Sequence, residues 1–242
     1  MMDDQDIATF KSALREKILS EALTVMNVFL DTEAGKVAER LRRTGIYKSA
    51  RCVLVPPVAF FRQTALNALL DGKRLVYPSP GVHKGFFAVD PAKIPPAQKS
   101  VAASFRSPNP WAQKIAHRTR AAVHIDLVVT PCLAAVRDGG RLGDGSGLVD
   151  LQIACLCALG WIHARTALVG IVPEANVLDA LPMKSTDIRL HWIVTERRVL
   201  KTTWREEPRT PILWEMLDKR TIRRNDLLFF LKGELNSSFA CR

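Results

Sequence analysis

Residues 138–150, DGGRLGDGSGLVD, combine glycines, one arginine and acidic side chains in a pattern that suits phosphate binding. Gly143, Gly145 and Gly147 alternate, which lets backbone N–H groups converge on an anion without obstruction by Cβ atoms. A predicted strand precedes the segment and a predicted helix follows it, so the positive end of the helix dipole would face the same anion. The segment is not a P-loop, because no Gly-Lys-Ser/Thr follows, and its spacing is not the Rossmann fingerprint. A tight turn without a ligand is the alternative interpretation.

Asp150 falls in the first turn of the helix predicted after this loop. Magnesium in proteins prefers one or two carboxylates together with phosphate oxygens. We therefore expect Asp150 to hold Mg²⁺ against a bound phosphate. The alternative is that Asp150 only caps the helix.

The elements that must position this loop alternate between helix and strand. Apolar residues at helical spacing predict one helix over residues 4–23 and a second over 32–43, capped by Asp31 or Thr32. Further helices are expected at 64–70 and 148–159, with helical pieces near 213–217 and 227–231. Short apolar runs predict strands at 51–56, 74–78, 126–130, 133–136, 166–172 and 190–195. Seven prolines between residues 78 and 110 predict a surface excursion with short pieces of structure. The alternation predicts an α/β fold with a mainly parallel sheet, and no linker divides it, so a single domain over 1–242 is expected.

Composition narrows the class of protein. The chain has 242 residues, 48% of them hydrophobic, which is ordinary for a globular protein. No stretch reaches the roughly 18 apolar residues of a membrane span, and the acidic N-terminus has no apolar core like that of a secretory signal, so we expect a cytoplasmic protein with no membrane partner. Five cysteines predict buried thiols rather than a disulfide framework, and the histidines show no paired metal spacing.

The net charge is +11, from 35 basic and 24 acidic side chains. Such a surface favours anionic partners, including nucleotide phosphates, polyglutamate tails and nucleic acid. Basic residues are densest over 40–51 and 197–224. A solvated surface that only serves solubility is the alternative interpretation.

The segment from Arg141 to Asp150, read as RLGxGxGxxD, resembles the signature of the 5-formyltetrahydrofolate cyclo-ligase family, also called methenyltetrahydrofolate synthetase. The resemblance is collinear over about 190 positions. It includes KSALR at 11–15, LLDGKRLVYP at 69–78, Leu181-Pro182, Asp187, and VTE at 194–196. It implies a three-layer α/β/α sandwich. The implied reaction is the ATP-dependent cyclisation of 5-formyltetrahydrofolate to 5,10-methenyltetrahydrofolate, which needs positioning and neutralisation of phosphate charge more than a strong base.

The resemblance also implies roles for individual residues. Lys11 and Arg15, on one face of a helix, would reach a triphosphate, although a solvated helix face is the alternative. Arg141, Gly143, Gly145, Ser146 and Gly147 would cradle the phosphates of ATP. Asp150 and Asp187 would hold Mg²⁺, although Asp187 alone would be interpreted as a turn residue. No residue is assigned as a catalytic acid or base.

The chain departs from the family pattern at several places. Leu148 and Val149 stand where the family has aromatic residues, and Asp144 adds a negative charge beside the expected phosphates. A glutamate that contacts folate is replaced within FFRQT at 60–64, where Arg62 and Gln63 are the substitute contacts. These departures resemble a divergent branch, the methenyltetrahydrofolate synthetase domain-containing proteins. Three hypotheses therefore stay open: an enzyme that uses Mg-ATP and a reduced folate with full or reduced activity, a catalytically silent relative that binds a nucleotide or phosphate, and a basic module that binds RNA. The oligomeric state is not predicted.

Overall fold

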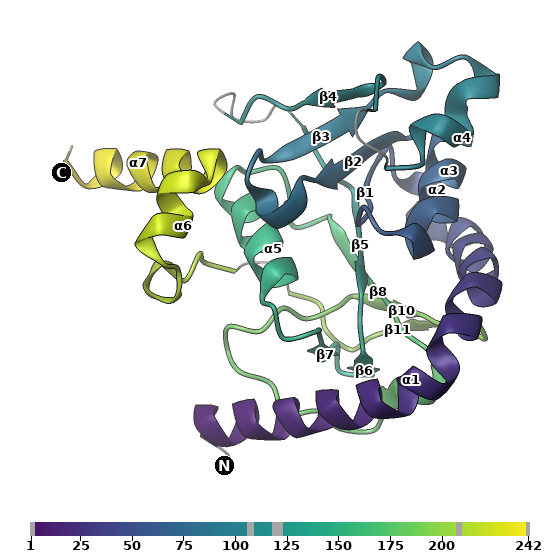
Figure 1. Cartoon of the computed structure of the whole chain (residues 1–242), viewed down its shortest axis with the longest axis horizontal. Helices are drawn as coiled ribbons and strands as arrows, with labels where there is room; N and C mark the ends of the chain where they lie inside the picture. The colour runs from purple at the N-terminus through teal and green to yellow at the C-terminus, as the bar shows by residue number, and fades with distance from the viewer. Residues whose placement is uncertain (1–2, 106–108, 118–122, 207–209, 241–242) are drawn as a thin grey trace.

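The computed structural model describes residues 3–105, 109–117, 123–206 and 210–240 (Figure 1). Its helices are α1 (Asp4–Arg42), α2 (Gly45–Ser49), α3 (Arg62–Leu70), α4 (Lys99–Ala102), α5 (Leu148–Ala158), α6 (Lys219–Arg224) and α7 (Asp226–Ala240). Its strands are β1 (Cys52–Leu54), β2 (Arg74–Pro78), β3 (Phe86–Val89), β4 (Ala112–Lys114), β5 (Leu127–Pro131), β6 (Ala134–Val136), β7 (Arg141–Leu142), β8 (Ala167–Ile171), β9 (Val177–Leu178), β10 (Trp192–Val194) and β11 (Val199–Lys201). Short 3₁₀ turns include η1 (Ala59–Phe61) and η5 (Glu174–Asn176).

The main sheet has the strand order β11-β10-β8-β5-β1-β2-β3-β4. The five strands from β10 to β2 run parallel, and β11, β3 and β4 add to the two edges in antiparallel orientation. The predicted α/β class with a mainly parallel sheet is therefore confirmed. Parallel strands are buried on both faces, which explains why the predicted runs are mostly apolar.

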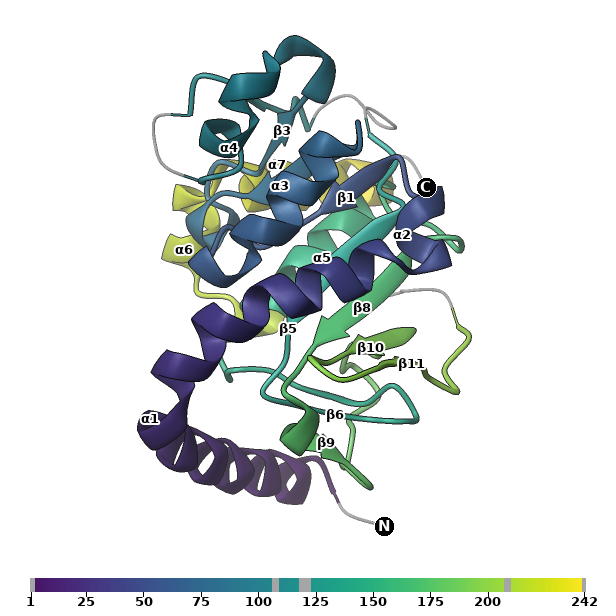
Figure 2. The ribbon, with the colours of Figure 1, turned by 90° about the vertical axis from the view of Figure 1, so that its right-hand side faces the viewer.

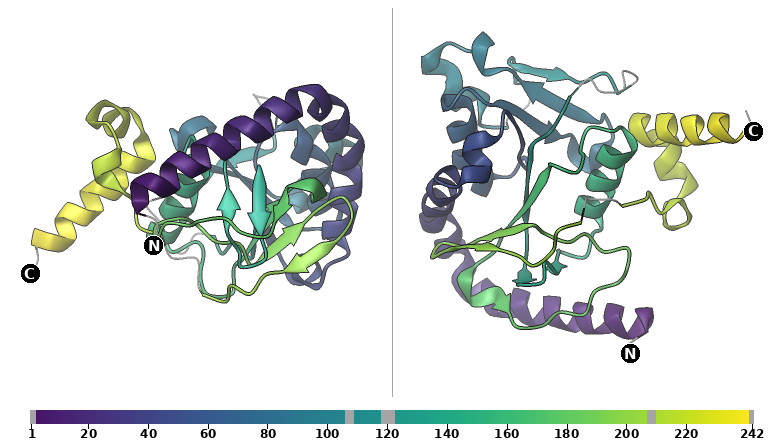
Figure 3. Two further views of the ribbon diagram at one scale, coloured as in Figure 1. Left: turned by 90° about the horizontal axis from the view of Figure 1, so that it is seen from below. Right: turned by 180° about the vertical axis from the view of Figure 1, so that it is seen from behind.

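Helices cover both faces of this sheet (Figures 1 and 2). Alternation along β1 shows the division: Val53 points into a core shared with α1, α2 and α3, whereas Leu54 points into a core shared with α5, α6 and α7. Both side chains are almost fully buried, at 0% and 2% exposure. The result is the α/β/α sandwich that the resemblance implied. Helices α6 and α7 extend outward from the second layer (Figures 1 and 3).

Helix α1 corrects one prediction, because residues 4–42 form one helix instead of two. Asp3 caps its first turn by accepting hydrogen bonds from the backbone of Gln5 and Asp6. Asp31 and Thr32, the predicted caps, lie inside the helix, where such residues cost only a fraction of a kcal/mol, roughly 0.7 at most. The helix bends between its halves, so its N-terminal half crosses below the sheet and its C-terminal half packs on the sheet face (Figure 2).

Two further predictions need correction. The proline-rich segment 78–110 contains short pieces of structure, as predicted, but it is not confined to the surface, because β3 within it pairs with β2 and buries Phe86 and Val89. The strand predicted at 133–136 leaves the main sheet: β6 belongs to a small second sheet with the order β7-β6-β9. Among the described helices, none is long and apolar enough to cross a membrane.

Candidate functional site

The glycine loop lies beside the carboxyl ends of the parallel strands. Strand β5 leads directly into β6, and the loop connects β7 to the start of α5. The chain proceeds from β1 to β2 on one side, whereas β5 and the later strands add on the other side of β1. Ligands of open α/β sheets bind at such a switch point, outside the carboxyl ends of the strands. The topology therefore places the loop where a ligand site is expected.

Arg141 and Asp150 form the centre of the site. The guanidinium Nη2 of Arg141 donates to Oδ2 of Asp150 at 2.8 Å, and the two side chains are 4% and 37% exposed. Burial is the largest single influence and lowers the pKa of Arg141, but attraction to Asp150, its hydrogen bond, and the nearby Cys132 and Asp187 together outweigh burial, so the pKa is raised. Among the described residues, Nε and Nη1 of Arg141 have no hydrogen-bond partner although both atoms are buried. A buried cationic donor without an acceptor is costly, so this guanidinium favours an anion beside it.

The glycines make room for arginine side chains. A Cβ on Gly143 would lie 2.9 Å from Nη1 of Arg141, closer than a side chain allows. Gly145 has a φ of +93°, a backbone conformation that L residues rarely adopt, and a Cβ there would lie 3.4 Å from Arg15. Nε of Arg15 donates to the carbonyl oxygen of Gly143 at 2.8 Å. Two guanidinium groups therefore meet at the loop.

The loop remains open to solvent from residue 144 to residue 147. Oδ1 of Asp144 accepts hydrogen bonds from the backbone N–H of Ser146 at 2.9 Å and from its hydroxyl at 2.7 Å. Burial acts to raise the pKa of Asp144, but the bonds from Ser146 and the nearby arginines outweigh burial and lower it. The loop turns into α5 at Gly147, and the first N–H groups of any helix lack intrahelical acceptors. The first helical N–H, that of Leu148, donates to the hydroxyl of Ser146 at 3.2 Å, so side chains of the loop itself occupy the donors of residues 146 and 148 in this structure.

Lys11 and Asp187 form a second ion pair of the same kind. Nζ of Lys11, which is 5% exposed, lies 2.5 Å from Oδ2 of Asp187. The same oxygen accepts from the backbone N–H of Lys184 at 2.6 Å. Asp187 is close enough to Arg141 to contribute to raising the pKa of that guanidinium. The structure thus brings together three predicted cations, both predicted metal ligands and the glycine loop.

Arg62 and Gln63 do not contact this group in the part of the chain that is described. Both are exposed at the start of α3, which follows β1 at the same switch point. Arg62 donates to the hydroxyl of Ser100 at 3.3 Å, and Gln63 donates to Asn67 at 2.8 Å. Their position borders the strand ends, but their present contacts lie within the α3–α4 region.

Sequence reasoning missed an acidic network at the same sheet edge. Glu174 follows β8, and its Oε2 accepts from the hydroxyl of Thr195 at 2.6 Å, just after β10. Arg198 completes the network at 2.6 Å from Glu174, and Glu196 accepts from the backbone N–H of Glu174. The hydrogen bond from Thr195, together with Arg198, lowers the pKa of Glu174 although burial opposes this. The available signal was an acidic residue soon after each of two neighbouring parallel strands.

The carboxylates of this site fit magnesium only if a bound phosphate supplies further oxygen ligands to the metal. Among the described residues, no group of three or more His, Cys, Asp or Glu side chains could hold a metal ion. Asp150 and Asp187 could supply two oxygens, which is the number that magnesium takes from protein when phosphate supplies others. Arg141, with two unsatisfied donors between these carboxylates, fits that phosphate.

A family model described as the 5-formyltetrahydrofolate cyclo-ligase family matches residues 7–196. The methenyltetrahydrofolate synthase domain-containing protein of Mus musculus is 28% identical over 236 residues, covering 93% of this chain and 59% of that protein. The 5-formyltetrahydrofolate cyclo-ligase of Escherichia coli strain K12 is 32% identical over 75 residues, covering 31% of this chain and 38% of that enzyme. The chain thus spans little more than half the length of the domain-containing relative. The structure of 5,10-methenyltetrahydrofolate synthetase from Aquifex aeolicus superposes with a TM-score of 0.55 at 20% identity, covering 80% of this chain and 93% of that one.

Proposed function

Because the chain belongs to the 5-formyltetrahydrofolate cyclo-ligase family, we propose that its loop 143–147 binds the phosphates of ATP together with Mg²⁺, next to a site for 5-formyltetrahydrofolate. One observation carries the proposal: Arg141 is buried, paired with Asp150, and has two further donors without partners in the described structure. A phosphate oxygen is the ligand chemistry that satisfies such donors.

The two ion pairs suggest how the chain's own residues would act. Without a ligand, Lys11 is neutralised by Asp187 and Arg141 by Asp150. When Mg-ATP binds, the cations would turn to phosphate oxygens and the carboxylates would be released to the metal. Magnesium, once bound, supplies additional neutralisation of phosphate charge. Binding of metal and nucleotide should therefore be synergistic. The nucleotide draws the cations away from the two carboxylates, and the metal then pairs with those carboxylates.

The folate would occupy the switch-point side of the loop. Cyclisation requires the formyl oxygen to lie about 3–3.5 Å from the γ-phosphorus, in line with the leaving oxygen. Arg62 and Gln63, exposed at the start of α3, are the nearest candidates along the chain to contact the pterin or the glutamate tail. Neither side chain can replace the hydrogen-bond pattern of a carboxylate.

A second candidate function is a silent relative that binds the nucleotide without turning over folate. Leu148 and Val149 pack against the core that α5 shares with the sheet, so they offer no aromatic wall to a folate. Asp144 adds a negative charge to the loop that is to hold a triphosphate. These features lead us to propose turnover that is absent or far below an ordinary enzyme rate of about 10 per second.

Two measurements test the proposal. Calorimetry with ATP should show tight binding only when Mg²⁺ is present, and Arg15→Gln should weaken it, whereas Lys17→Gln, at an exposed cation on the same helix, should not. Absence of binding in wild-type protein would remove both candidate functions. Formation of methenyltetrahydrofolate, followed by its absorbance in the presence of Mg-ATP, then separates the two: an ordinary rate supports the enzyme, and binding without turnover supports the silent relative.

A further inference from the structure

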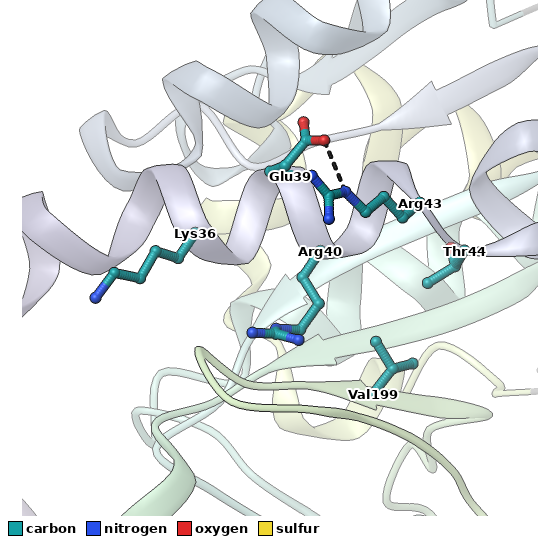
Figure 4. A pocket seen from close by; sticks show the side chains of 6 residues that line it. All are labelled: Lys36, Glu39, Arg40, Arg43, Thr44 and Val199. Carbon is teal, nitrogen blue, oxygen red and sulfur yellow. Dashed lines mark hydrogen bonds and ion pairs between the residues drawn. The ribbon is translucent and has the colours of Figure 1, made fainter.

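A second basic site lies at the other end of α1. A pocket of about 380 Å³ opens between the C-terminal half of α1 and the β10–β11 hairpin, within the size range of small-ligand pockets, about 300–1,000 Å³. Its lining residues are Lys36, Glu39, Arg40, Arg43, Thr44 and Val199 (Figure 4). Arg15 of the loop site is roughly seven helical turns away along α1, so the pocket is distinct from the loop site.

The pocket is positively charged, with three cations against one carboxylate. Oε1 of Glu39 accepts from Nε of Arg43 at 3.0 Å, so among the lining residues the one carboxylate is engaged by Arg43 and none pairs with Arg40. Lys36 is 63% exposed and pairs with Glu33 at 2.8 Å, and Arg43 is 77% exposed. These two side chains stand at the solvent side, where they can turn toward a ligand without disturbing the core.

Arg40 provides the independent observation that points to a ligand. Its side chain runs from α1 toward the hairpin (Figure 4). Nη2 donates to the carbonyl oxygen of Glu196 at 3.0 Å. Its Nε is buried and has no hydrogen-bond partner among the described residues. The hydroxyl of Thr44, the other polar group of the lining near the end of α1, donates to the carbonyl oxygen of Leu41 and accepts from the backbone N–H of Tyr47. An acceptor within the pocket is what the guanidinium lacks.

A neighbouring hollow does not share this property. It has a volume of about 430 Å³ and lies on the other side of Arg43, over Arg42 and Lys73. Arg42 is paired with Asp71 at 2.5 Å, and Lys73 donates to the carbonyl oxygen of Ala50 at 2.7 Å. Its inner cations are thus already satisfied, whereas Arg40 is not.

We propose that the pocket around Arg40 binds a small anion that carries phosphate or carboxylate groups, as a site separate from the glycine loop. Lys36 and Arg43 would neutralise its charge, Arg40 would donate Nε–H to one oxygen, and Val199 would contact its apolar part. Because the outer cations are exposed, the affinity should fall as ionic strength rises.

The test is titration calorimetry of the full chain with inorganic pyrophosphate and with citrate, in metal-free buffer at low ionic strength. Arg15→Gln serves as background, because it should weaken binding at the loop site and leaves this pocket intact. Arg40→Gln should then weaken binding about tenfold or more, which corresponds to the loss of one hydrogen bond from a charged donor. Arg220→Gln is the charge-matched control, since Arg220 is exposed on α6 and should leave the affinity unchanged.

Each result of the calorimetry either supports or contradicts the proposed anion site. Binding of pyrophosphate alone supports a phosphate ligand, and binding of citrate alone supports a carboxylate ligand. If neither binds in the Arg15→Gln background, or if Arg220→Gln weakens binding as much as Arg40→Gln, the proposal is wrong. Should Arg40→Gln fail to fold, Lys36→Gln gives the same test, because that side chain is largely exposed and its loss should still weaken binding.

Discussion

Replacing Asp150 with asparagine tests the central ion pair and the metal site at once. The substitution keeps the shape of the side chain and an oxygen that accepts from Arg141, but it removes the negative charge. Arg141, which is 4% exposed, would then be a buried cation without its counter-charge. Asp150 itself is 37% exposed, so solvent compensates for part of the loss.

The magnitude follows from these two exposures. Breaking a fully buried ion pair costs about 3–5 kcal/mol, and losing a single charged hydrogen bond costs about 1.5–3 kcal/mol. With a remaining acceptor and a half-exposed carboxylate, we expect Asp150→Asn to lower the free energy of unfolding by about 1–2 kcal/mol. For a chain of this length that corresponds to a fall in melting temperature of roughly 2–8 °C.

The assay pairs thermal unfolding with calorimetry. Asp226→Asn is the matched control, because Asp226 pairs with Lys114 at 3.3 Å with both side chains exposed, and such pairs contribute about 0–1 kcal/mol. In nucleotide titrations, Asp150→Asn should weaken Mg-ATP about tenfold and leave metal-free ATP nearly unchanged. Equal weakening with and without Mg²⁺ would refute the metal role, and a melting temperature no lower than that of Asp226→Asn would refute the stabilising ion pair.

Three further predictions concern the backbone and two titrating groups. Gly145→Ala should cost about 1–3 kcal/mol and weaken ATP binding, because its φ is +93°, whereas Gly35→Ala, in open space on α1, should be neutral or stabilising; equal melting temperatures would contradict this. The hydrogen bond from Arg42 holds the pKa of Asp71 below its ordinary value although burial opposes it, so the stability that Asp71 contributes is present above about pH 4 and is lost as pH falls further. Urea unfolding should show Asp71→Asn to be less stable than wild type at pH 7, with the difference shrinking at pH 3. Burial lowers the pKa of His191, whose Nδ1 accepts from the backbone of a neighbouring strand, so wild-type stability should fall as pH drops below about 6.5, and His191→Gln should lose this pH dependence.

The parallel strands could be predicted from the sequence because they are buried on both faces over most of their length and are therefore mostly apolar. Strand β3 was missed because prolines surround it, and proline is compatible with the edge region where β3 lies. The continuity of α1 was missed because Asp31 and Thr32 suit both a helix cap and, at small cost, a helix interior. Local sequence patterns fit either a strand or a surface segment at β3, and either a cap or a helix interior at Asp31 and Thr32. Tertiary packing decides between them.

In the candidate site too, local motifs could be predicted from the sequence, whereas contacts between distant residues could not. The glycine loop and Asp150 could be predicted because they lie within one short segment. The pairing of Lys11 with Asp187 joins residues 176 positions apart, and only the crossing of α1 below the second sheet brings them together. The pocket at Arg40 depends on where the β10–β11 hairpin meets α1, which no local motif encodes.

The strand order also has a consequence for how the chain assembles as it is synthesised. Strands β1 to β4 come from residues 52–114 and complete one side of the sheet, whereas the other edge of β1 is covered only when β5 arrives from residues 127–131. Until then, β1 exposes unpaired backbone groups beside Val53 and Leu54, which are almost fully buried in the finished fold. Unpaired apolar edges of this kind pair readily with other chains. The first half of the molecule should therefore be the most aggregation-prone stage of its biogenesis, and the addition of β5 the step that ends this vulnerability.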